Sequence, residues 1–388
     1  MRVSNDILMS LDKGHEVILV LLDYSSAFDT ISHDTILQRM SDWFGIQDRV
    51  LDWFRTYLTS RTQTVLINGV QSSVHMPTQG VPQGSVIGPL VFTMYTSPLE
   101  NIIDSYGFSK MLYADDTQIY VSCKSSDIGD LIPRVLSCIK EIKEWSRLNG
   151  LKLNSSKTEV LHIKSRFRSH IPLPPFQIDG VEVVPVKKVR NLGVLFDDQF
   201  TMHSYVSSKC RSVSFALQKI SKIRPFIDKG TTEKLVHAFV MCHLDYCNSL
   251  LYGVPDIQFQ KLQVIQNSAA RLVTRTNKRE SISSVLRALH WLPIKSRVKF
   301  KILLLAFHCF HDIAPSYLSE LVVKYEPVRN LRSIQKDLYN VPVVRTKWYG
   351  KRGFAHAAPE LWNSIPCSVR QANTVEQFKT ALKTYLFN

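Results

Sequence analysis

The sequence has few of the features that mark secreted and membrane proteins. Its 388 residues include only seven cysteines, and no two of them form a Cys-x-x-Cys pair. The longest apolar runs, residues 17–22 and 302–307, are far shorter than the ~20 residues that cross a bilayer. Asp6, Asp12 and Glu16 interrupt the region where a signal peptide would need an unbroken apolar core. We therefore expect a soluble, intracellular protein with free thiols.

Closely spaced metal-binding motifs are also missing. Cys242 and Cys247 lie near His237 and His243, but zinc sites usually show tighter paired spacing. We expect these side chains to serve in packing rather than in binding a metal.

Acidic residues are scarce relative to basic ones. The chain has 48 Lys and Arg against 33 Asp and Glu, which gives a formal net charge of +15. A surface with that excess attracts polyanions, and nucleic acid is the commonest of them. A basic protein without such a partner is the alternative that charge alone leaves open.

The first half of the chain alternates strand and helix patterns. The apolar run at residues 17–22 suits a buried central strand, and Asp23 follows it directly. Asn68-Gly69 and Asp179-Gly180 are strong hairpin signals. Further strands are expected at residues 108–113, 117–121, 157–163 and 189–196, and long helices at 127–149, 203–223, 259–273 and 297–310.

Three aspartates stand where a carboxylate is costly. Asp23 ends the apolar strand, and Asp115 and Asp116 lie side by side in the turn between two others. Adjacent carboxylates repel each other, so a divalent cation is a natural partner. If these strands are neighbours, the three carboxylates converge on one edge of a sheet. A solvated turn is the alternative for the Asp115-Asp116 pair taken alone.

Five short motifs occur in order along the first 200 residues. They are Leu-Asp-Tyr-Ser-Ser-Ala-Phe-Asp at 22–29, Gln-Gly-Val-Pro-Gln-Gly-Ser-Val-Ile-Gly-Pro-Leu at 79–90, Tyr-Ala-Asp-Asp at 113–116, Asn-Gly-Leu-Lys-Leu-Asn with Lys-Thr-Glu at 149–159, and Asn-Leu-Gly-Val at 191–194. Each is weak to moderate alone. Together they resemble the conserved motifs of reverse transcriptases.

Three later stretches narrow this resemblance. Residues 244–248, 289–293 and 358–363 are similar to the region after the polymerase in non-LTR retrotransposon (LINE) proteins of the jockey and CR1/L2-like groups. The second and third of these stretches argue against a group II intron or telomerase-like relative.

The resemblance implies an α+β fold with three parts. Residues 1–199 would form a palm, an antiparallel sheet of about four strands with packed helices, in which hairpins near Asp179 and Val189 form the primer grip. Residues 200–285 would form a helical thumb, and residues 286–388 a basic, helical C-terminal region.

The resemblance also assigns roles in RNA-directed DNA synthesis. Asp23, Asp115 and Asp116 would bind two Mg²⁺ ions, for which Mn²⁺ can substitute. Phe28 would lie under the sugar of the incoming dNTP and exclude a 2′-hydroxyl; its alternative is a core aromatic. Lys157 would protonate or stabilise the leaving pyrophosphate; its alternative is a solvated lysine.

Gln83, Gly84 and Tyr113 would contact nucleotide and template. A glycine in the loop lets backbone approach the nucleotide closely, and the next helix offers free N–H groups to phosphate. A plain turn and helix cap is the alternative for Gln83 and Gly84.

The implied partners are an RNA template, a DNA primer and dNTP, with no membrane and a nuclear site of action. Only about 22 residues precede Asp23, where the family has a fingers region. We therefore expect an N-terminally truncated chain with impaired synthesis. The alternative is a catalytically dead remnant that binds RNA or an RNA–DNA hybrid. The sequence does not indicate an oligomeric state.

Overall fold

The structure is a computed structural model that describes residues 1–168, 172–326 and 337–387. It divides into two compact units, residues 15–192 and residues 1–14 with 193–388. Within the described ranges, no helix is both long enough and apolar enough to cross a membrane. The three-part division expected from the sequence stays a prediction.

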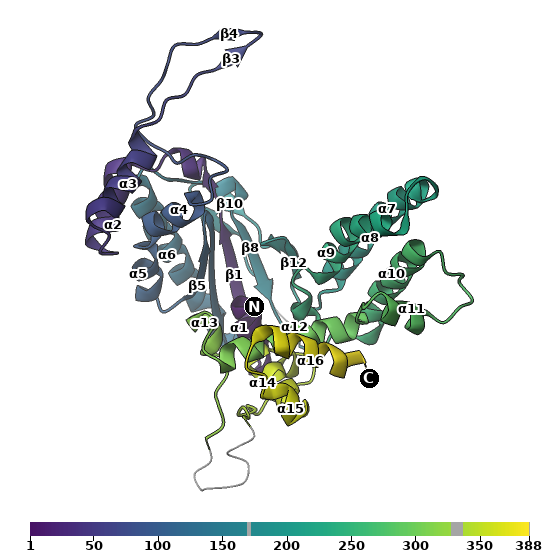
Figure 1. Cartoon of the computed structure of the whole chain (residues 1–388). Helices are drawn as coiled ribbons and strands as arrows, with labels where there is room; N and C mark the ends of the chain where they lie inside the picture. Colours follow the sequence, from purple (N-terminus) through teal and green to yellow (C-terminus); the bar gives the residue numbers. More distant parts are fainter. Residues whose placement is uncertain (169–171, 327–336, 388) are drawn as a thin grey trace. The chain divides into compact units, whose positions relative to one another are not determined.

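The unit of residues 15–192 is built on a four-stranded antiparallel sheet in the order β5-β6-β1-β8 (Figure 1). The apolar sequence of β1 places it in the interior, paired with β6 on one side and β8 on the other. The sheet strands are β1 (Glu16–Leu22), β5 (Ser109–Tyr113), β6 (Asp116–Cys123) and β8 (Glu159–Ile163).

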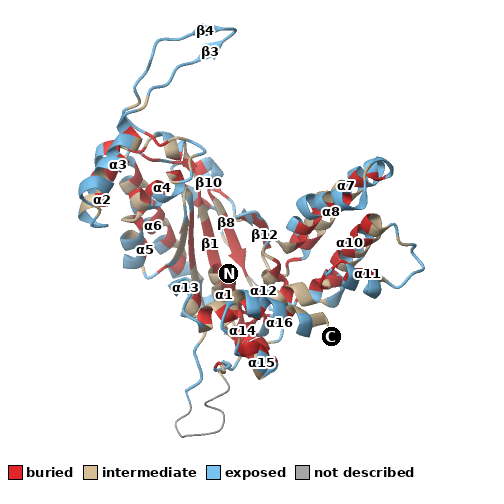
Figure 2. Cartoon of the chain, in the orientation of Figure 1, coloured by how far each residue is buried: buried red, intermediate tan, exposed pale blue. Residues whose placement is uncertain are grey.

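Helices pack against this sheet on one face. Ile18, Val20 and Leu22 alternate along β1 and join the core that α6 closes with Val135 and Ile139. Figure 2 shows β1 and β8 as mostly buried. The helices of the unit are α2 (His33–Asp42), α3 (Asp48–Thr59), α4 (Gly88–Thr96), α5 (Leu99–Ser105) and α6 (Ile128–Leu148), with the short helical turns η1 (Ala27–Asp29), η2 (Ser125–Asp127) and η3 (Ser155–Lys157).

Two hairpins form where the sequence predicts them. Asn68 and Gly69 have φ values of 50° and 82°, and Asp179 and Gly180 have 56° and 74°, as a two-residue turn of this type requires. The first hairpin extends away from α3 (Figure 1). The remaining strands are β2 (Tyr24–Ser25), β3 (Leu66–Ile67), β4 (Val70–Gln71), β7 (Lys152–Leu153), β9 (Phe176–Ile178), β10 (Val181–Val183) and β11 (Lys188–Asn191).

Residues 189–196 do not form one continuous strand but two short strands joined by a turn, in keeping with the hairpin expected near Val189. The chain turns at Leu192 and Gly193, whose φ values are 44° and 78°. β11 therefore ends at Asn191, and β12 (Val194–Asp197) begins after the turn.

The second unit is helical, as the sequence predicts. Its helix α7 covers the predicted residues, and α14, which the sequence pattern did not reveal, contains Pro359. The helices are α1 (Arg2–Asp12), α7 (His203–Ile223), α8 (Lys229–Val236), α9 (Cys242–Asp245), α10 (Asp256–Thr274), α11 (Ile282–Ala288), α12 (Ile294–Phe310), α13 (Ser316–Ser319), α14 (Phe354–Ser364), α15 (Cys367–Arg370) and α16 (Val375–Phe387), with the turns η4 (Arg224–Phe226), η5 (His237–Met241), η6 (Asn248–Leu251) and η8 (Gly350–Arg352).

Candidate active site

The register of the sheet brings charged residues together at one edge. Leu22 pairs with Thr117 on β6, so the next residues along, Asp23 and Asp116, face each other. On the other side Leu21 pairs with Glu159. The chain before β8 turns through η3, and this turn brings Lys157 Nζ to 3.3 Å from Asp23 Oδ2. Directly opposed residues in antiparallel strands have Cα atoms roughly 4.5–5.5 Å apart. Strand pairing therefore assembles this charged edge from segments about 90 and 40 residues apart along the chain.

Asp115 and Asp116 occupy the tight hairpin between β5 and β6. Tyr113 pairs with Asp116, and Ala114 takes a φ of 52° to close the turn. The pKa of Asp116 is raised above its ordinary value, first by partial loss of hydration and then by the negative charges of Asp115 and Asp23. The three carboxylates therefore act on one another electrostatically.

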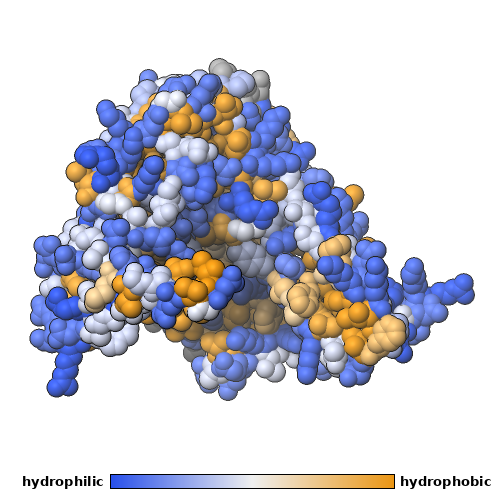
Figure 3. Space-filling model, turned by 90° about the horizontal axis from the view of Figure 1, so that it is seen from above, coloured by the Kyte–Doolittle hydropathy of each residue, from blue (hydrophilic) through white to orange (hydrophobic). Residues whose placement is uncertain are grey.

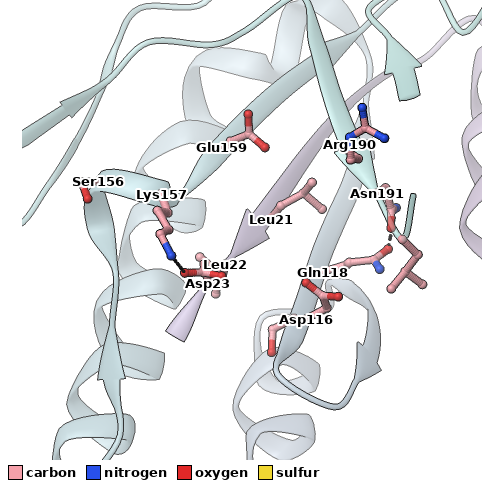
Figure 4. A pocket seen from close by; sticks show the side chains of 12 residues that line it. Leu21, Leu22, Asp23, Asp116, Gln118, Ser156, Lys157, Glu159, Arg190 and Asn191 are labelled. Carbon is pink, nitrogen blue, oxygen red and sulfur yellow. Dashed lines mark hydrogen bonds and ion pairs between the residues drawn. The ribbon is translucent and has the colours of Figure 1, made fainter. Parts of the chain in front are cut away.

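Asp23 is held between this acidic pair and Lys157. Its side chain is 36% exposed, but Oδ2 is closed off from solvent and makes no hydrogen bond within the described residues. Lys157 Nζ lies 3.3 Å from that oxygen, outside hydrogen-bond geometry but close enough for an ion pair (Figure 4). A buried carboxylate oxygen without a hydrogen bond calls for a cation.

A cavity of about 410 Å³ opens beside these residues and is lined by Asp23, Asp116 and Lys157. Its wall also contains Gln118 and Asn191, both buried, and the Asn191 amide donates a 2.8 Å hydrogen bond to Gln118 Oε1 (Figure 4). The other lining residues are Leu21, Leu22, Thr117, Ser156, Glu159, Arg190 and Leu192. The cavity thus places carboxylates and cationic side chains around one space.

Sequence reasoning missed Gln118, Glu159 and Arg190 as parts of this wall. A glutamine inside the apolar strand 117–121 was the one signal that could have revealed Gln118, since a buried amide needs a partner. Glu159 and Arg190 carry no such signal.

The donor set suits a hard divalent cation, because Mg²⁺ prefers carboxylate oxygens. The orphaned Asp23 Oδ2 and the mutual repulsion at Asp116 fit such an ion. Across the described residues, however, no three Asp, Glu, His or Cys side chains stand in a ready ligand cluster. The cysteines and histidines at 237–247 do not form such a cluster either. The three aspartates therefore fit a divalent cation in donor type and charge. In this structure the positive charge next to Asp23 is the ammonium group of Lys157.

The glycine-rich loop of residues 79–90 packs against the first motif. The Gly80 and Val81 amides donate to the carbonyls of Ile31 and Phe28 at 2.7 and 2.8 Å. The Gln83 amide donates to both oxygens of Asp29, at 2.9 and 3.2 Å.

Gln83 and Asp29 line a separate cavity of about 520 Å³, together with Arg61, Gln63, His75 and residues 77–82. Gly84 has a φ of 78° with open space around it. Gln83 and Gly84 are therefore accessible, but the structure does not bring them into the cavity of Asp23.

Phe28 and Tyr113 lie in different settings. Phe28 is half-buried and packs on Phe92 with ring centroids 5.1 Å apart, so it is partly a core residue. Tyr113 is 64% exposed and stands opposite Asp116.

The chain is similar to a known protein family over residues 5–196. Residues 5–196 match the family described as "Reverse transcriptase (RNA-dependent DNA polymerase)". The chain is 26% identical over 289 residues to the "Probable RNA-directed DNA polymerase from transposon X-element" of Drosophila melanogaster. It is also 26% identical over 282 residues to the "RNA-directed DNA polymerase from mobile element jockey" of Drosophila funebris. Each alignment covers 70% of this chain and 30% of the relative, so the chain spans about a third of their length.

Among solved structures, apo telomerase from Candida tropicalis matches with a TM-score of 0.38 and 12% identity, covering 74% of this chain and 52% of the telomerase chain. The matched family, the named relatives and the mixed fold of antiparallel sheet and helices agree with the palm and thumb class expected from sequence. The chain belongs to the reverse transcriptase family, in the branch carried by non-LTR retrotransposons.

Proposed function

We propose that this chain carries out RNA-directed DNA synthesis, joining a dNTP to the 3′-hydroxyl of a DNA primer on an RNA template. The observation that supports it most is the register that sets Asp23 opposite Asp116, next to Asp115. Because the relatives are RNA-directed DNA polymerases of mobile elements, we extend their reaction to this chain. We also propose a nuclear site of action, as the resemblance to these mobile-element proteins implies.

In this proposal Asp23, Asp115 and Asp116 hold two Mg²⁺ ions, with Mn²⁺ as a substitute. When bound, these ions lower the pKa of the primer hydroxyl and offset charge on the triphosphate. The chain supplies these carboxylates, including the buried Asp23 Oδ2, and the cationic side chains of Lys157 and Arg190 beside them.

Lys157 is proposed to face the pyrophosphate as it leaves. Its side chain is 66% exposed and 3.3 Å from Asp23, so its ammonium group reaches the same cavity. A charged donor there stabilises the negative charge that develops on the leaving group.

Phe28 is proposed to support the sugar of the dNTP, and Tyr113, Gln83 and Gly84 to line the path of nucleotide and template. Phe28 is fixed by Phe92, and a ring held in one place can exclude a 2′-hydroxyl by shape. Gln83 is oriented by Asp29, which accepts both of its hydrogen bonds.

Primer extension on poly(rA)/oligo(dT) with Mg²⁺ tests this function. We expect the parent chain to incorporate dTTP and the Asp115→Asn variant to lose at least ~100-fold in rate, as loss of a metal ligand does. Asp42→Asn is the matched control, because Asp42 is an exposed carboxylate at the end of α2. Equal rates for parent and Asp115→Asn would refute the proposal.

A second candidate is binding of an RNA–DNA hybrid without synthesis. The absence of a ready ligand cluster among the described residues and the ion pair of Lys157 with Asp23 favour it. Filter binding separates the two: a parent that binds hybrid but never extends the primer supports this second function.

A further inference from the structure

A third cavity lies in the helical unit, far along the sequence from Asp23, Asp115 and Asp116. Its volume is about 300 Å³, near the lower end of the range for small-ligand pockets. It is formed by α9, η6, α12, α16 and the segment 289–293. None of the catalytic candidates lines it.

One charge pair in the wall is already satisfied. The Arg297 guanidinium donates Nε to Asp245 Oδ1 at 2.7 Å and Nη2 to Asp245 Oδ2. This two-point contact neutralises the one carboxylate that lines the cavity.

Asn248 leaves an acceptor open. The side chain is 5% exposed, and its Nδ2 faces Asp245 Oδ1 at 3.4 Å, which fixes the orientation of the amide. Its Oδ1 is buried and has no hydrogen-bond partner in the ranges that the structure describes. Burying such an acceptor is costly unless a donor reaches it.

Lys301 and Lys383 bring positive charge to the same space from α12 and α16, and His290 lines it as well. Neither lysine forms an ion pair with another described residue. The charge of Lys301 is also felt by His308 on the same helix. Burial is the main cause that lowers the pKa of His308, and the positive charges of Lys379 and Lys301 lower it further. With Asp245 neutralised by Arg297, the cavity carries an excess of cations.

We propose that this cavity binds a nucleotide. The phosphate would lie between Lys301 and Lys383, and a hydroxyl or amino group would donate to Asn248 Oδ1. Leu292, Phe300 and Leu304 supply the apolar wall that a base needs. The cavity size suits a single nucleotide, either free or at the end of an RNA. This inference does not depend on the polymerase function.

Calorimetric titration with 5′-AMP in EDTA tests it, in an Asp23→Asn/Asp116→Asn background that disables the proposed metal site. We expect one saturable site per chain and at least ~10-fold weaker binding of adenosine and of inorganic phosphate. Lys301→Gln and Lys383→Gln should each weaken AMP binding about 10-fold, the usual cost of one charge-assisted contact. The controls Lys299→Gln and Lys379→Gln remove exposed lysines of α12 and α16 that do not line the cavity, and they should change nothing.

Asn248→Leu separates a binding role from a structural one. Because it removes a buried, unpaired acceptor, the free variant should melt no lower than the parent, yet bind AMP at least ~5-fold more weakly. If Asn248→Leu does not fold, the variants Lys301→Gln and Lys383→Gln and their two controls still test whether the cavity binds AMP. Absence of saturable AMP binding, or unchanged affinity in both lysine variants, overturns the proposal.

Two further measurements test where AMP binds and whether the natural ligand is a free nucleotide or the end of an RNA. Photo-crosslinking with 8-azido-AMP should label peptides within 289–301 or 375–387; labelling confined to residues 15–192 overturns the proposal. Competition by a short 5′-phosphorylated RNA identifies an RNA end as the natural source, whereas AMP binding without such competition identifies the free nucleotide.

Discussion

Lys157 and Asp116 act on the Asp23 carboxylate in opposite senses: the first attracts it and the second repels it. The ammonium group of Lys157 offsets the charge of Asp23, while Asp116 adds to it and is itself harder to ionise. A bound cation would therefore relieve the repulsion between the Asp23 and Asp116 carboxylates. At the scale of single residues, two changes test this account of the site and of the loop beside it.

The pH dependence of stability follows from Asp116. Because its pKa is raised in the folded chain, the fold binds this proton more tightly than the unfolded chain does. The contribution of the carboxyl to stability is therefore present below its ordinary pKa and lost as pH rises through the raised pKa. In EDTA at pH 7, Asp116→Asn should melt higher than the parent by at most about 2–3 °C, and the gap should close toward pH 4.

Melting curves of both chains in EDTA, with Asp42→Asn as the control, check this. Added Mg²⁺ should raise the melting temperature of the parent more than that of Asp116→Asn. A variant that melts lower than the parent at pH 7 without metal would show that no repulsion acts at this edge.

Gly80 is required by both its conformation and its surroundings. Its φ is 85°, and an added Cβ would lie 2.8 Å from the Asp29 carbonyl oxygen. Gly69 has a similar φ of 82° with nothing within 4 Å. Gly69→Ala should cost about 1 kcal/mol of unfolding free energy, and Gly80→Ala about 2 kcal/mol more, since a backbone clash adds to the strain. Urea unfolding measures the difference; equal costs would mean that the loop does not pack on Asp29 this tightly.

At the scale of elements, sequence patterns predicted the strands and turns whose structure depends on neighbouring residues in the chain. The apolar run before Asp23 and the Asn68-Gly69 turn each specify their structure within a few residues. The helix through Pro359 escaped prediction, because packing at a distance decides it.

The residues of the candidate site also fall into those that sequence motifs predicted and those that they did not. Asp23, Asp116 and Lys157 are recognisable from motifs, and the register brings them into one cavity. The hydrogen bond of Asn191 with Gln118 joins residues 73 positions apart and has no local signal. The placing of Gln83 in a different cavity likewise depends on how the loop packs on Asp29.

Arg39 ties three helices together behind the sheet. Its guanidinium donates to the Tyr95 carbonyl and to Asn149 Oδ1, and it lies 4.6 Å from the Tyr95 ring centroid and 5.4 Å from that of Trp145. A lysine cannot make both contacts, so Arg39→Lys should cost about 2–3 kcal/mol in urea unfolding. Arg55→Lys on exposed α3 is the control and should cost under ~0.5 kcal/mol. Similar costs for the two variants would argue against this three-helix contact.

At the scale of the whole molecule, charge dominates the expected behaviour. The net charge of +15 should make binding to an RNA–DNA hybrid strongly dependent on salt. On the face seen in Figure 3, hydrophilic residues cover most of the surface and hydrophobic ones form separate patches. Such a surface suits contact with phosphates, which carry no sequence information.

Fluorescence anisotropy across a salt series checks this expectation. If about six phosphates are contacted, affinity should fall roughly 10³-fold between 50 and 200 mM salt. Asp115→Asn should bind as the parent does, because it changes the metal site and not the basic surface. Affinity that is independent of salt would mean that the excess charge does not face the nucleic acid.

The most direct test of the acidic edge is to count bound Mn²⁺ by electron paramagnetic resonance. The sample would hold dTTP and a hybrid with a dideoxy-terminated primer, so that no synthesis occurs. We predict two saturable Mn²⁺ ions per parent chain and at least ~10-fold weaker binding in Asp23→Asn, because that variant loses a shared ligand. Identical Mn²⁺ binding by the parent and Asp23→Asn would contradict the proposed metal site.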